Sequence, residues 1–240
     1  MSKLSYIAVL AGTVMLSSPI CASASTFNFN TTNFGLSGSS TVDSASMAVD
    51  GVTVTLTAFS ISNDNSGTIS NKTQLTNGTG VYVSGSSNNV GVRSNLTGDG
   101  TNMDGGNVGS TSDLDEGILF TFSEVVTLDF INFDSFGASD DFNMTVDEVS
   151  ILVDHNSSDG DIPGVVSNAS ASDHFNFYVT GQEFLIWADG NSDSFRIDSV
   201  NATVVPVPAT VWLFGSCLLG LFSVARRGGR GQINSAFKIS

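Results

Sequence analysis

Apolar and polar side chains alternate residue by residue over several short stretches of this chain. In the stretch 52–61 the two sets fall on opposite faces of an extended strand: Val52, Val54, Leu56 and Ala58 on one face, Thr53, Thr55 and Thr57 on the other. A spacing of two places side chains on one face of a strand, whereas a helix needs a spacing of 3.6. Since no helical spacing persists between residues 25 and 204, this region is predicted to be built from strands.

Clusters of Gly, Asn, Ser and Asp interrupt the apolar stretches about every ten residues and mark where strands end. Further strands are predicted at 117–122, 125–133, 142–154, 174–180, 183–189 and 195–205. The pairs Ser123-Glu124 and Gly181-Gln182 each separate two of these stretches, so both are predicted to be tight hairpin turns. The segment 84–113 is rich in Gly, Asn and Ser and is predicted to form loops.

Many short antiparallel strands with turns at this spacing are typical of a two-sheet β-sandwich. The predicted fold class is therefore all-β, with a single antiparallel, jelly-roll-like β-sandwich domain over residues 25–204. A signal peptide and a C-terminal transmembrane helix are expected to flank it. The expected core includes Phe120, Phe122, Leu128, Phe130 and Ile186.

Charged residues are distributed unevenly along the chain. It has 23 acidic and 8 basic residues, a net charge of −15. All the acids lie between Asp43 and Asp198, where the only bases are Lys72, Arg93 and Arg196, so that stretch carries −20. Such a region repels nucleic acid and attracts divalent cations, and no nucleic-acid partner is expected.

The two cysteines, Cys21 and Cys217, lie near the two ends of the chain, outside the predicted domain. A disulfide within residues 25–204 is therefore excluded, and the domain has to be stabilised by burial alone.

The first 24 residues have the features of a secretory signal peptide. Lys3 precedes an apolar stretch, and Ala22-Ser23-Ala24 supplies the small residues that signal peptidase recognises. The predicted signal peptide is residues 1–24, with cleavage after Ala24, and the Sec translocon and signal peptidase are its expected partners.

The central region contains no sequence motif of a known catalytic site. Only His155 and His174 supply imidazoles, and nucleophile elbows, zinc-protease helices and phosphate-binding loops are missing from the sequence. The chain is therefore predicted not to be an enzyme, and no catalytic residue and no cofactor other than calcium is proposed.

Calcium is the one metal that the sequence suggests, because it takes carboxylate, amide and carbonyl oxygens. Candidate loops lie at 99–104, 154–161 and 189–193. In the last, Asp189, Asn191 and Asp193 have the spacing of the first ligands of an EF-hand loop, although Ser194 and Val200 replace its Gly and its bidentate Glu. A solvated turn remains the alternative, because Asp, Asn and Gly are also good turn residues.

The C-terminal segment combines prolines, an apolar stretch and arginines. The 17 residues from Ala209 to Ala225 carry no charge, and with the preceding "VVPVP" they reach the length that spans a bilayer. Arg226 and Arg227 follow directly and are expected to stay in the cytoplasm, which leaves the acidic domain outside.

The segment "VPVPATVWLFGSCLLGLFSVARR" closely resembles the PEP-CTERM sorting domain of exosortase substrates in Gram-negative bacteria, in its VPxPAxxWLFGSxLLGL form. The matching residues are Val205, Pro206, Pro208, Ala209, Trp212, Leu213, Phe214, Gly215, Ser216, Leu218, Leu219, Gly220, Leu221, Ala225, Arg226 and Arg227. Val207 takes the place of the Glu of the Pro-Glu-Pro motif. The sorting signal is assigned to residues 205–230, and a short tail to 231–240.

The resemblance implies that a membrane-embedded, cysteine-dependent exosortase recognises Pro206, Val207 and Pro208. The protein would be exported through the inner membrane, held there transiently by its C-terminal helix, and then moved to the cell surface or the extracellular matrix. It implies association with exopolysaccharide or biofilm. A permanently anchored surface protein is the alternative.

A carbohydrate-binding module on the same β-sandwich is a further alternative. Sugar rings stack on exposed aromatic side chains, and Trp187, Tyr82 and Tyr178 are the candidates. Trp187 alternates with Phe184 and Ile186, so it is expected on the opposite face, where either core packing or an outward orientation would fit. Extracellular polysaccharide is the corresponding partner.

Overall fold

The structure is a computed structural model of the whole chain. It describes residues 22–63, 69–94, 100–104, 114–168, 173–188, 193–206, 214–219 and 221–222. Ala22–Val205 forms one compact unit, referred to below as the β-domain, and Met1–Cys21 together with Pro206–Ser240 forms the other. In the second unit residues 214–219 and 221–222 are helical. Within the described residues, no helix has the length and apolar character needed to cross a membrane.

The β-domain is made of antiparallel strands, which confirms the predicted all-β class. The strands are β1 (Ala24–Asn28), β2 (Ser40–Val42), β3 (Ser44–Val49), β4 (Val52–Asn63), β5 (Ile69–Gln74), β6 (Gly80–Val83), β7 (Val90–Arg93), β8 (Met103–Asp104), β9 (Asp115–Asp134), β10 (Phe142–Val146), β11 (Val149–His155), β12 (Val166–Asn168), β13 (His174–Ala188) and β14 (Ser194–Val204). Strands β7 and β8 lie within the segment 84–113 that was predicted to form loops.

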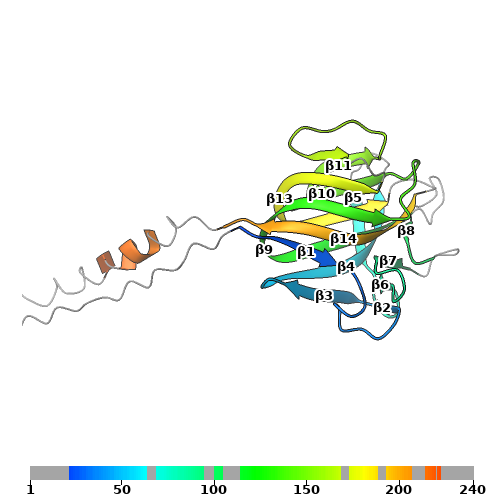
Figure 1. The fold of residues 1–240 in the computed structure, drawn as a ribbon, viewed down its shortest axis with the longest axis horizontal. Coiled ribbons are helices and arrows are strands. Elements are labelled where there is room, and N and C mark those ends of the chain that lie inside the picture. Colours follow the sequence, from blue (N-terminus) through cyan, green and yellow to red (C-terminus); the bar gives the residue numbers. More distant parts are fainter. Residues whose placement is uncertain are drawn as a thin grey trace, which may run out of the picture. The chain divides into compact units, whose positions relative to one another are not determined.

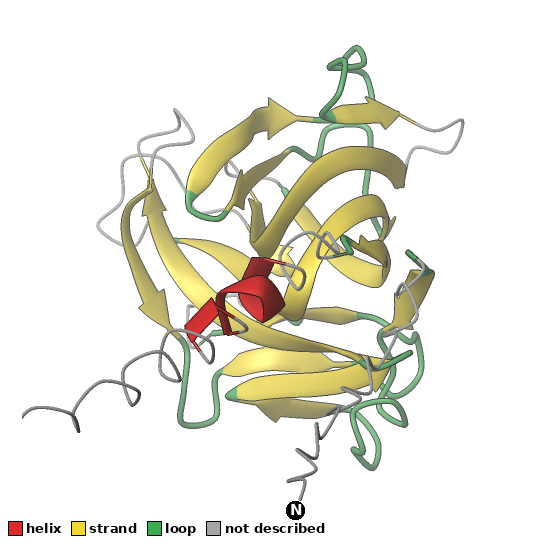
Figure 2. Cartoon of the chain, turned by 90° about the vertical axis from the view of Figure 1, so that its left-hand side faces the viewer, coloured by secondary structure: helices red, strands yellow, loops and turns green. Residues whose placement is uncertain are grey.

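The strands form one hydrogen-bonded sheet, whereas two separate sheets were predicted. Its main path runs β11-β10-β13-β9-β14-β7-β6-β2, and β4 joins through β9. Strands β9 and β13 are long and each belongs to both halves of this sheet. Figure 2 shows how strongly the strands curve. Residues 115–122 of β9 pair with β4, and residues 126–134 of the same strand pair with β14.

Both long strands bend at the two places where hairpin turns were predicted, so those two predictions are wrong. Val126 of β9 pairs with Gly181 of β13, and Thr121 of β9 pairs with Glu183. The register of the two strands shifts between these two pairs. The strands therefore continue through Ser123-Glu124 and Gly181-Gln182 with an irregularity, as bulged strands do where a sheet turns a corner. We refer to residues 122–125 and 181–183 as the corner.

Side-chain hydrogen bonds satisfy the backbone groups that the corner leaves without ladder partners. Gln182 donates from Nε2 to the carbonyl oxygen of Phe122 at 3.0 Å. Asp147 accepts through Oδ1 from the N–H groups of Gln182 and Glu183, at 3.0 and 2.9 Å. These three bonds give backbone groups at the bend the partners that the ladder does not provide there.

Asp147 itself lies in a tight turn that the sequence prediction placed inside one strand, 142–154. Strands β10 and β11 are joined there by Asp147 and Glu148, which have φ of 48° and 67°. Two successive residues with positive φ define a type I′ hairpin turn. The hairpin between β3 and β4 has the same geometry at Asp50-Gly51, with φ of 51° and 84°.

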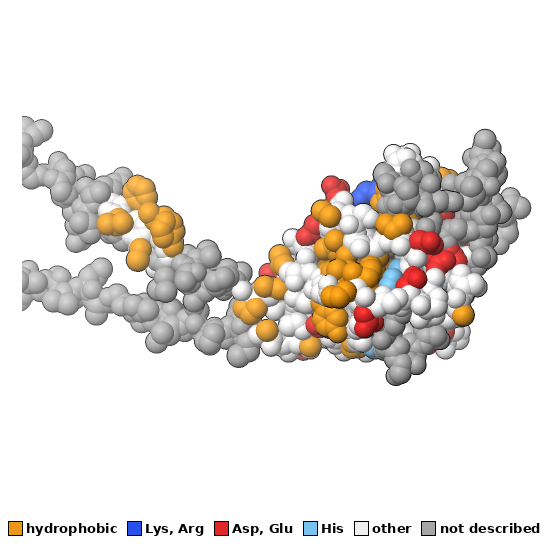
Figure 3. Space-filling model, turned by 90° about the horizontal axis from the view of Figure 1, so that it is seen from above, with side chains coloured by type: hydrophobic (Ala, Val, Ile, Leu, Met, Phe, Trp, Pro, Cys, Tyr) orange, Lys and Arg blue, Asp and Glu red, His pale blue; other side chains and the backbone are white. Residues whose placement is uncertain are grey.

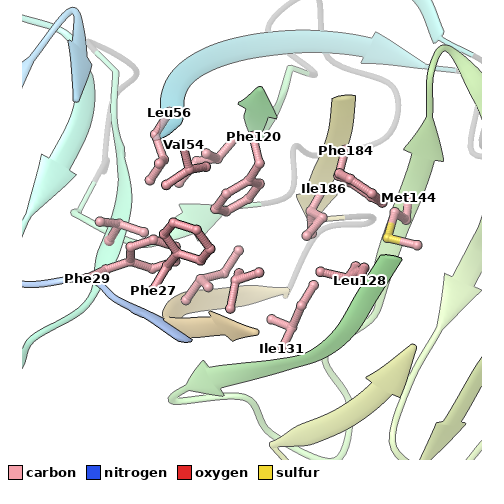
Figure 4. Packing of buried hydrophobic residues seen from close by; sticks show 14 of the residues in the cluster. Phe27, Phe29, Val54, Leu56, Phe120, Leu128, Ile131, Met144, Phe184 and Ile186 are labelled. Atoms are coloured by element: carbon pink, nitrogen blue, oxygen red, sulfur yellow. The ribbon is translucent and has the colours of Figure 1, made fainter. Parts of the chain in front are cut away.

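The core lies between the two halves of the bent sheet. Phe27 of β1 contacts Phe122 of β9 at 5.5 Å between ring centroids, and Phe29 contacts Phe120 at 5.7 Å. Figure 4 shows the rings of Phe27, Phe29 and Phe120 pointing into the same space as Val54, Leu56, Leu128 and Ile186. Val52, Val54, Leu56 and Ala58, which the sequence predicts to share one face of a strand, are all buried.

Phe130 is the exception among the predicted core residues. Phe120, Phe122, Leu128 and Ile186 are buried, whereas Phe130 is only half-buried and packs against His174 at 5.0 Å. In β14, Asn201 pairs with Phe130 of β9, and the next residue, Ala202, pairs with Leu128. The register of the two strands therefore shifts by one residue at this point. This bulge adds one residue to β9 and turns Phe130 to the outer face, while Ile131 and Phe133 take the core positions.

The β-domain contains its own core and its own boundaries. Every buried apolar side chain of the main cluster lies between Phe27 and Ala202. The first and last strands pair directly, with Ala24 opposite Thr203 (Figure 1). Residues 22–205 therefore have the features of a domain, with a core and boundaries of their own.

Replacing Gly181 with Ala is expected to destabilise the β-domain. A Cβ atom at this position would lie 2.3 Å from Cγ1 of Val146 and 2.9 Å from Oδ2 of Asp147. Overpacking of this kind costs about 1–3 kcal/mol, and denaturant unfolding measures it. Gly160→Ala is the matched control, because nothing lies within 4 Å of a Cβ there. Equal stability of the two variants would contradict the role of Gly181 in the corner.

Candidate functional site

Two of the three predicted calcium loops meet at one place on the β-domain. Asp104, at the end of the first loop, pairs with Ser194, which follows the third loop. Ser194 donates from Oγ to Oδ1 of Asp104 at 2.6 Å, and its N–H donates to Oδ1 of Asp140 at 3.3 Å. Oε2 of Glu116 accepts from the N–H of Asp104 at 3.2 Å. We call Asp104, Glu116 and Asp140, together with Asp193, which directly precedes Ser194 in the chain, the acidic cluster.

The acidic cluster is unusual because most of it is buried. Glu116, Asp140 and Asp193 are exposed by only 1%, 7% and 4%. The three basic side chains of the β-domain contact other residues: Lys72 pairs with Glu148, while Arg93 and Arg196 lie over the ring of Tyr82. Buried acids of this kind are either held by hydrogen bonds or bound to a metal ion.

The individual calcium predictions have different outcomes. Asp193 is buried in the acidic cluster, whereas Asp189 and Asn191 lie outside the described residues. Among the residues that the structure describes, three or more His, Cys, Asp or Glu side chains do not come together in a metal-binding arrangement. Calcium at 189–193 therefore stays a prediction.

The second predicted loop, 154–161, is organised by its own side chains. Asn156 accepts from the N–H of Ser158 at 2.8 Å, and Oδ2 of Asp159 accepts from the N–H of Asn156 at 2.9 Å. His155 is buried, with Nδ1 at 3.7 Å from Oδ2 of Asp159. Such bonds are typical of a solvated turn, which is the alternative to a calcium site in this loop.

Trp187 is fully buried, so the hypothesis that it stacks on a sugar ring is wrong. It lies on the outer side of the sheet, as its alternation predicted, but there it packs with Ile61 and Leu185 in a second small cluster. Gly117 of β9 makes room for it, because a Cβ there would lie 2.7 Å from Cβ of Trp187. Of the two uses that the sequence allowed, core packing is the one observed.

The two tyrosines differ in accessibility. Tyr82 is half-buried, with the guanidinium carbons of Arg93 and Arg196 at 5.2 and 5.7 Å from its ring centroid. Tyr178 is 56% exposed, and its hydroxyl lies 3.3 Å from Oγ of Ser167.

Figure 3 shows hydrophobic side chains gathered in a band on one face of the β-domain, with acidic side chains beside it.

The outer face of β9, β13 and β14 carries a network of polar side chains that the sequence analysis did not single out. Asn132 donates to Oγ of Ser199 at 2.8 Å and also bonds His174. Similar cross-strand bonds join Thr127 to Thr180, Asp129 to Thr203, and Thr26 to Asn201. The alternation of polar residues predicts the face but not the pairing, which depends on strand register.

Asp198 lies close to two other carboxylates. Partial burial raises the pKa of Asp198 above its ordinary value of 3.8, and the charges of Asp134 and Asp173 raise it further. A hydrogen bond from Ser199 acts in the opposite direction. The neutral form of Asp198 is thus favoured more in the folded chain than in the unfolded chain.

Residues assigned to processing lie at the edges of the β-domain. Ala22 is exposed, Ala24 is the first residue of β1, and Pro206 is exposed directly after the last strand. Val207, Pro208, Arg226 and Arg227 lie outside the described residues, as does most of the predicted transmembrane stretch.

Comparison of the chain with protein-family models, with curated proteins and with solved structures found no match in any of the three.

Asp198→Asn is expected to raise the melting temperature at neutral pH, because it removes a carboxylate that is disfavoured first by its partial burial and then by the charges of Asp134 and Asp173. A carboxyl whose pKa is raised on folding stabilises the protein fully below the unfolded value, and this contribution is lost as pH rises through the folded value. The difference should therefore shrink as the pH falls below 3.8, where Asp198 is protonated in both the folded and the unfolded chain.

Thermal unfolding at several pH values measures this effect. Glu124→Gln, a substitution at an exposed position of the corner, serves as the control and should leave the pH profile unchanged. A difference between Asp198→Asn and the natural chain that does not depend on pH would contradict the assigned cause.

Proposed function

We propose that the chain is a non-enzymatic exported protein of the cell surface or extracellular matrix, delivered by a C-terminal sorting signal that exosortase recognises and cleaves. In this proposal the bent sheet acts as a jelly-roll-like β-sandwich that survives both processing steps. The proposal rests on the resemblance of residues 205–230 to the PEP-CTERM signal and on the positions of the two ends of the β-domain.

The position of the two ends is the observation that supports the proposal most directly. Ala24 pairs with Thr203, so the chain enters and leaves the β-domain at the same end of one antiparallel strand pair. A signal peptide and a C-terminal span could then both insert into one membrane, with the whole β-domain on one side of that membrane. Cleavage after Ala24 would remove a single residue from β1.

The last hydrogen bond of the sheet also lies close to the proposed cleavage region. The N–H of Val205 donates to the carbonyl oxygen of Val125 at 3.0 Å, and Pro206 follows without an N–H to continue the ladder. Proline also disfavours helix in the residue before it. A cut at Pro206, Val207 or Pro208 would therefore leave every strand of the β-domain intact.

The proposal includes a definite route. The Sec translocon and signal peptidase act first, the C-terminal span then holds the chain in the inner membrane, and exosortase releases or transfers it. The net charge of −20 between Asp43 and Asp198 fits a domain that stays soluble outside the cell. Exopolysaccharide is the proposed surrounding material.

Replacing both Pro206 and Pro208 with Ala is expected to abolish processing, because the extended recognition segment would be free to continue the membrane helix. Mass spectrometry of the mature protein from an exosortase-containing host should find the natural chain truncated near residue 207 and the variant intact. Pro163→Ala, at an exposed loop proline, is the matched control and should be processed normally.

An intact C-terminus in the natural protein would contradict the sorting proposal. The chain would then be a permanently anchored surface protein, which is the alternative from the sequence.

Calcium bound at the loop 189–193, beside the acidic cluster, is a second proposal, independent of the tail. The described residues of the cluster do not form a metal-binding arrangement by themselves, so ligands from this loop would have to complete the site. Asp104 and Asp193 come from two different predicted loops, and the bond network of Ser194 brings them into one neighbourhood with Asp140. Calcium prefers several carboxylate and carbonyl oxygens, and extracellular modules bind it at about 10⁻⁴ to 10⁻³ M.

Calcium at a hundredfold excess over its dissociation constant is expected to raise the melting temperature by about 5–10 °C, since the linkage energy is about 2.7 kcal/mol. Asp193→Asn should remove most of this shift. Asp154→Asn is the control, because it lies in a different predicted loop and has φ of 54°, which Asn adopts readily. An unchanged melting temperature together with no heat in calorimetric titration would contradict calcium binding.

A further inference from the structure

The β-domain contains a hollow of about 430 Å³ that none of the sites above includes. Six of its eight described lining residues carry a hydroxyl or amide group and two are leucines, although carbon atoms contribute most of the surface that faces the hollow: Ser60, Ser62, Asn71, Thr73, Leu75, Thr79, Ser94 and Leu114. None of these residues is charged. A volume of this size lies within the range of small-molecule sites, about 300–1,000 Å³.

The hollow continues the inner face of β4 beyond the hydrophobic core. Val54, Leu56 and Ala58 point into the core, and the next two residues of the same face are Ser60 and Ser62. On β5, Thr73 lies opposite Ser60 and Asn71 lies opposite Ser62, so all four side chains share that face. The alternation of the strand continues, but the inward-facing side chains change from apolar to polar.

Ser60 has a buried hydroxyl that makes no hydrogen bond within the fold. It is exposed by only 8%, and its Oγ has no hydrogen-bond partner within the structure. A buried hydroxyl without a partner is destabilising, and a hydrophobic residue at this inner position would continue the core. Thr79, in contrast, already donates from Oγ1 to the carbonyl oxygen of Thr76 at 2.7 Å.

We propose that this hollow binds a neutral saccharide. Serine and threonine hydroxyls and the Asn71 amide both donate and accept hydrogen bonds, as the hydroxyls of a sugar require of a partner. Leu75 and Leu114 provide apolar contacts for the C–H face of a sugar ring. The uncharged lining, within a domain that carries −20, selects against anionic sugars such as uronates.

This inference does not depend on the processing of the tail. It concerns a site lined by eight described residues between Ser60 and Leu114, whereas the proposed sorting depends on residues 205–230. A chain that is never cleaved could still bind a sugar, and a chain that binds no sugar could still be sorted.

The test is a titration of the full chain, purified in a detergent without a sugar headgroup, with a panel of neutral mono- and oligosaccharides. Saturation-transfer NMR and calorimetry measure binding, and glucose against glucuronate forms a matched pair of ligands that differ in charge. At least one neutral saccharide is expected to bind, with the corresponding uronate at least about tenfold weaker.

Three variants assign the binding to the hollow. Ser60→Ala removes the buried hydroxyl and is expected to weaken binding about threefold to tenfold. Thr73→Phe, at an exposed position of the lining, is expected to block the hollow and abolish binding while the chain remains folded. Thr57→Val, on the opposite face of β4, is the control and should bind as the natural chain does.

Two results would overturn the proposal. One is that none of the neutral saccharides binds to the folded natural chain. The other is that a saccharide binds with equal affinity to the natural chain and to Thr73→Phe, which would place its site elsewhere.

Discussion

The structure depends on one constraint: a single antiparallel sheet has to bend so that its two halves bury the same set of apolar side chains. The cysteines lie at Cys21 and Cys217, so no disulfide can fix this arrangement within the β-domain. Burial of aromatic pairs such as Phe27 with Phe122 provides the stabilisation instead. The corner makes this burial possible, because β9 and β13 pass from one half of the sheet to the other without interruption.

The corner also explains why a small number of polar residues have large structural roles. Asp147 is held in a tight turn between β10 and β11, and its carboxylate accepts from two N–H groups of the bent strand β13. Gly181 allows the turn to approach that strand closely. Loss of either feature would leave backbone groups unsatisfied at the point where the sheet changes direction.

The sequence predicted the strands and their buried faces better than the connections between them. The face formed by Val52, Val54, Leu56 and Ala58 follows directly from the alternation, and it is buried. Ser123-Glu124 and Gly181-Gln182 have the composition of turns, but in the structure they lie in bends of continuous strands. Composition marks where a ladder is interrupted, whereas the partners on both sides decide whether the chain reverses or continues.

The candidate sites, like the connections between strands, could be predicted only in part from the sequence. Alternation placed Trp187 on the outer side of the sheet, but it could not reveal that Ile61 and Leu185 cover that position beside Gly117. It also could not predict that a bulge turns Phe130 outward, or that Ser194 joins Asp104 and Asp140 from distant segments. For the hollow, the serines and threonines were visible in the sequence, but only the pairing of β4 with β5 places them on one face.

The sequence by itself determined the all-β class, the strand faces and the acidic character of the domain, because these follow from local spacing and composition. It also carries the resemblance of the C-terminal segment to a sorting signal, which is a property of contiguous residues. The tertiary structure decided that one sheet bends around the core, that both ends of the domain lie on one strand pair, and which polar residues share a hollow. These features depend on register between strands far apart in the chain, and the alternation within a single strand contains no information about that register.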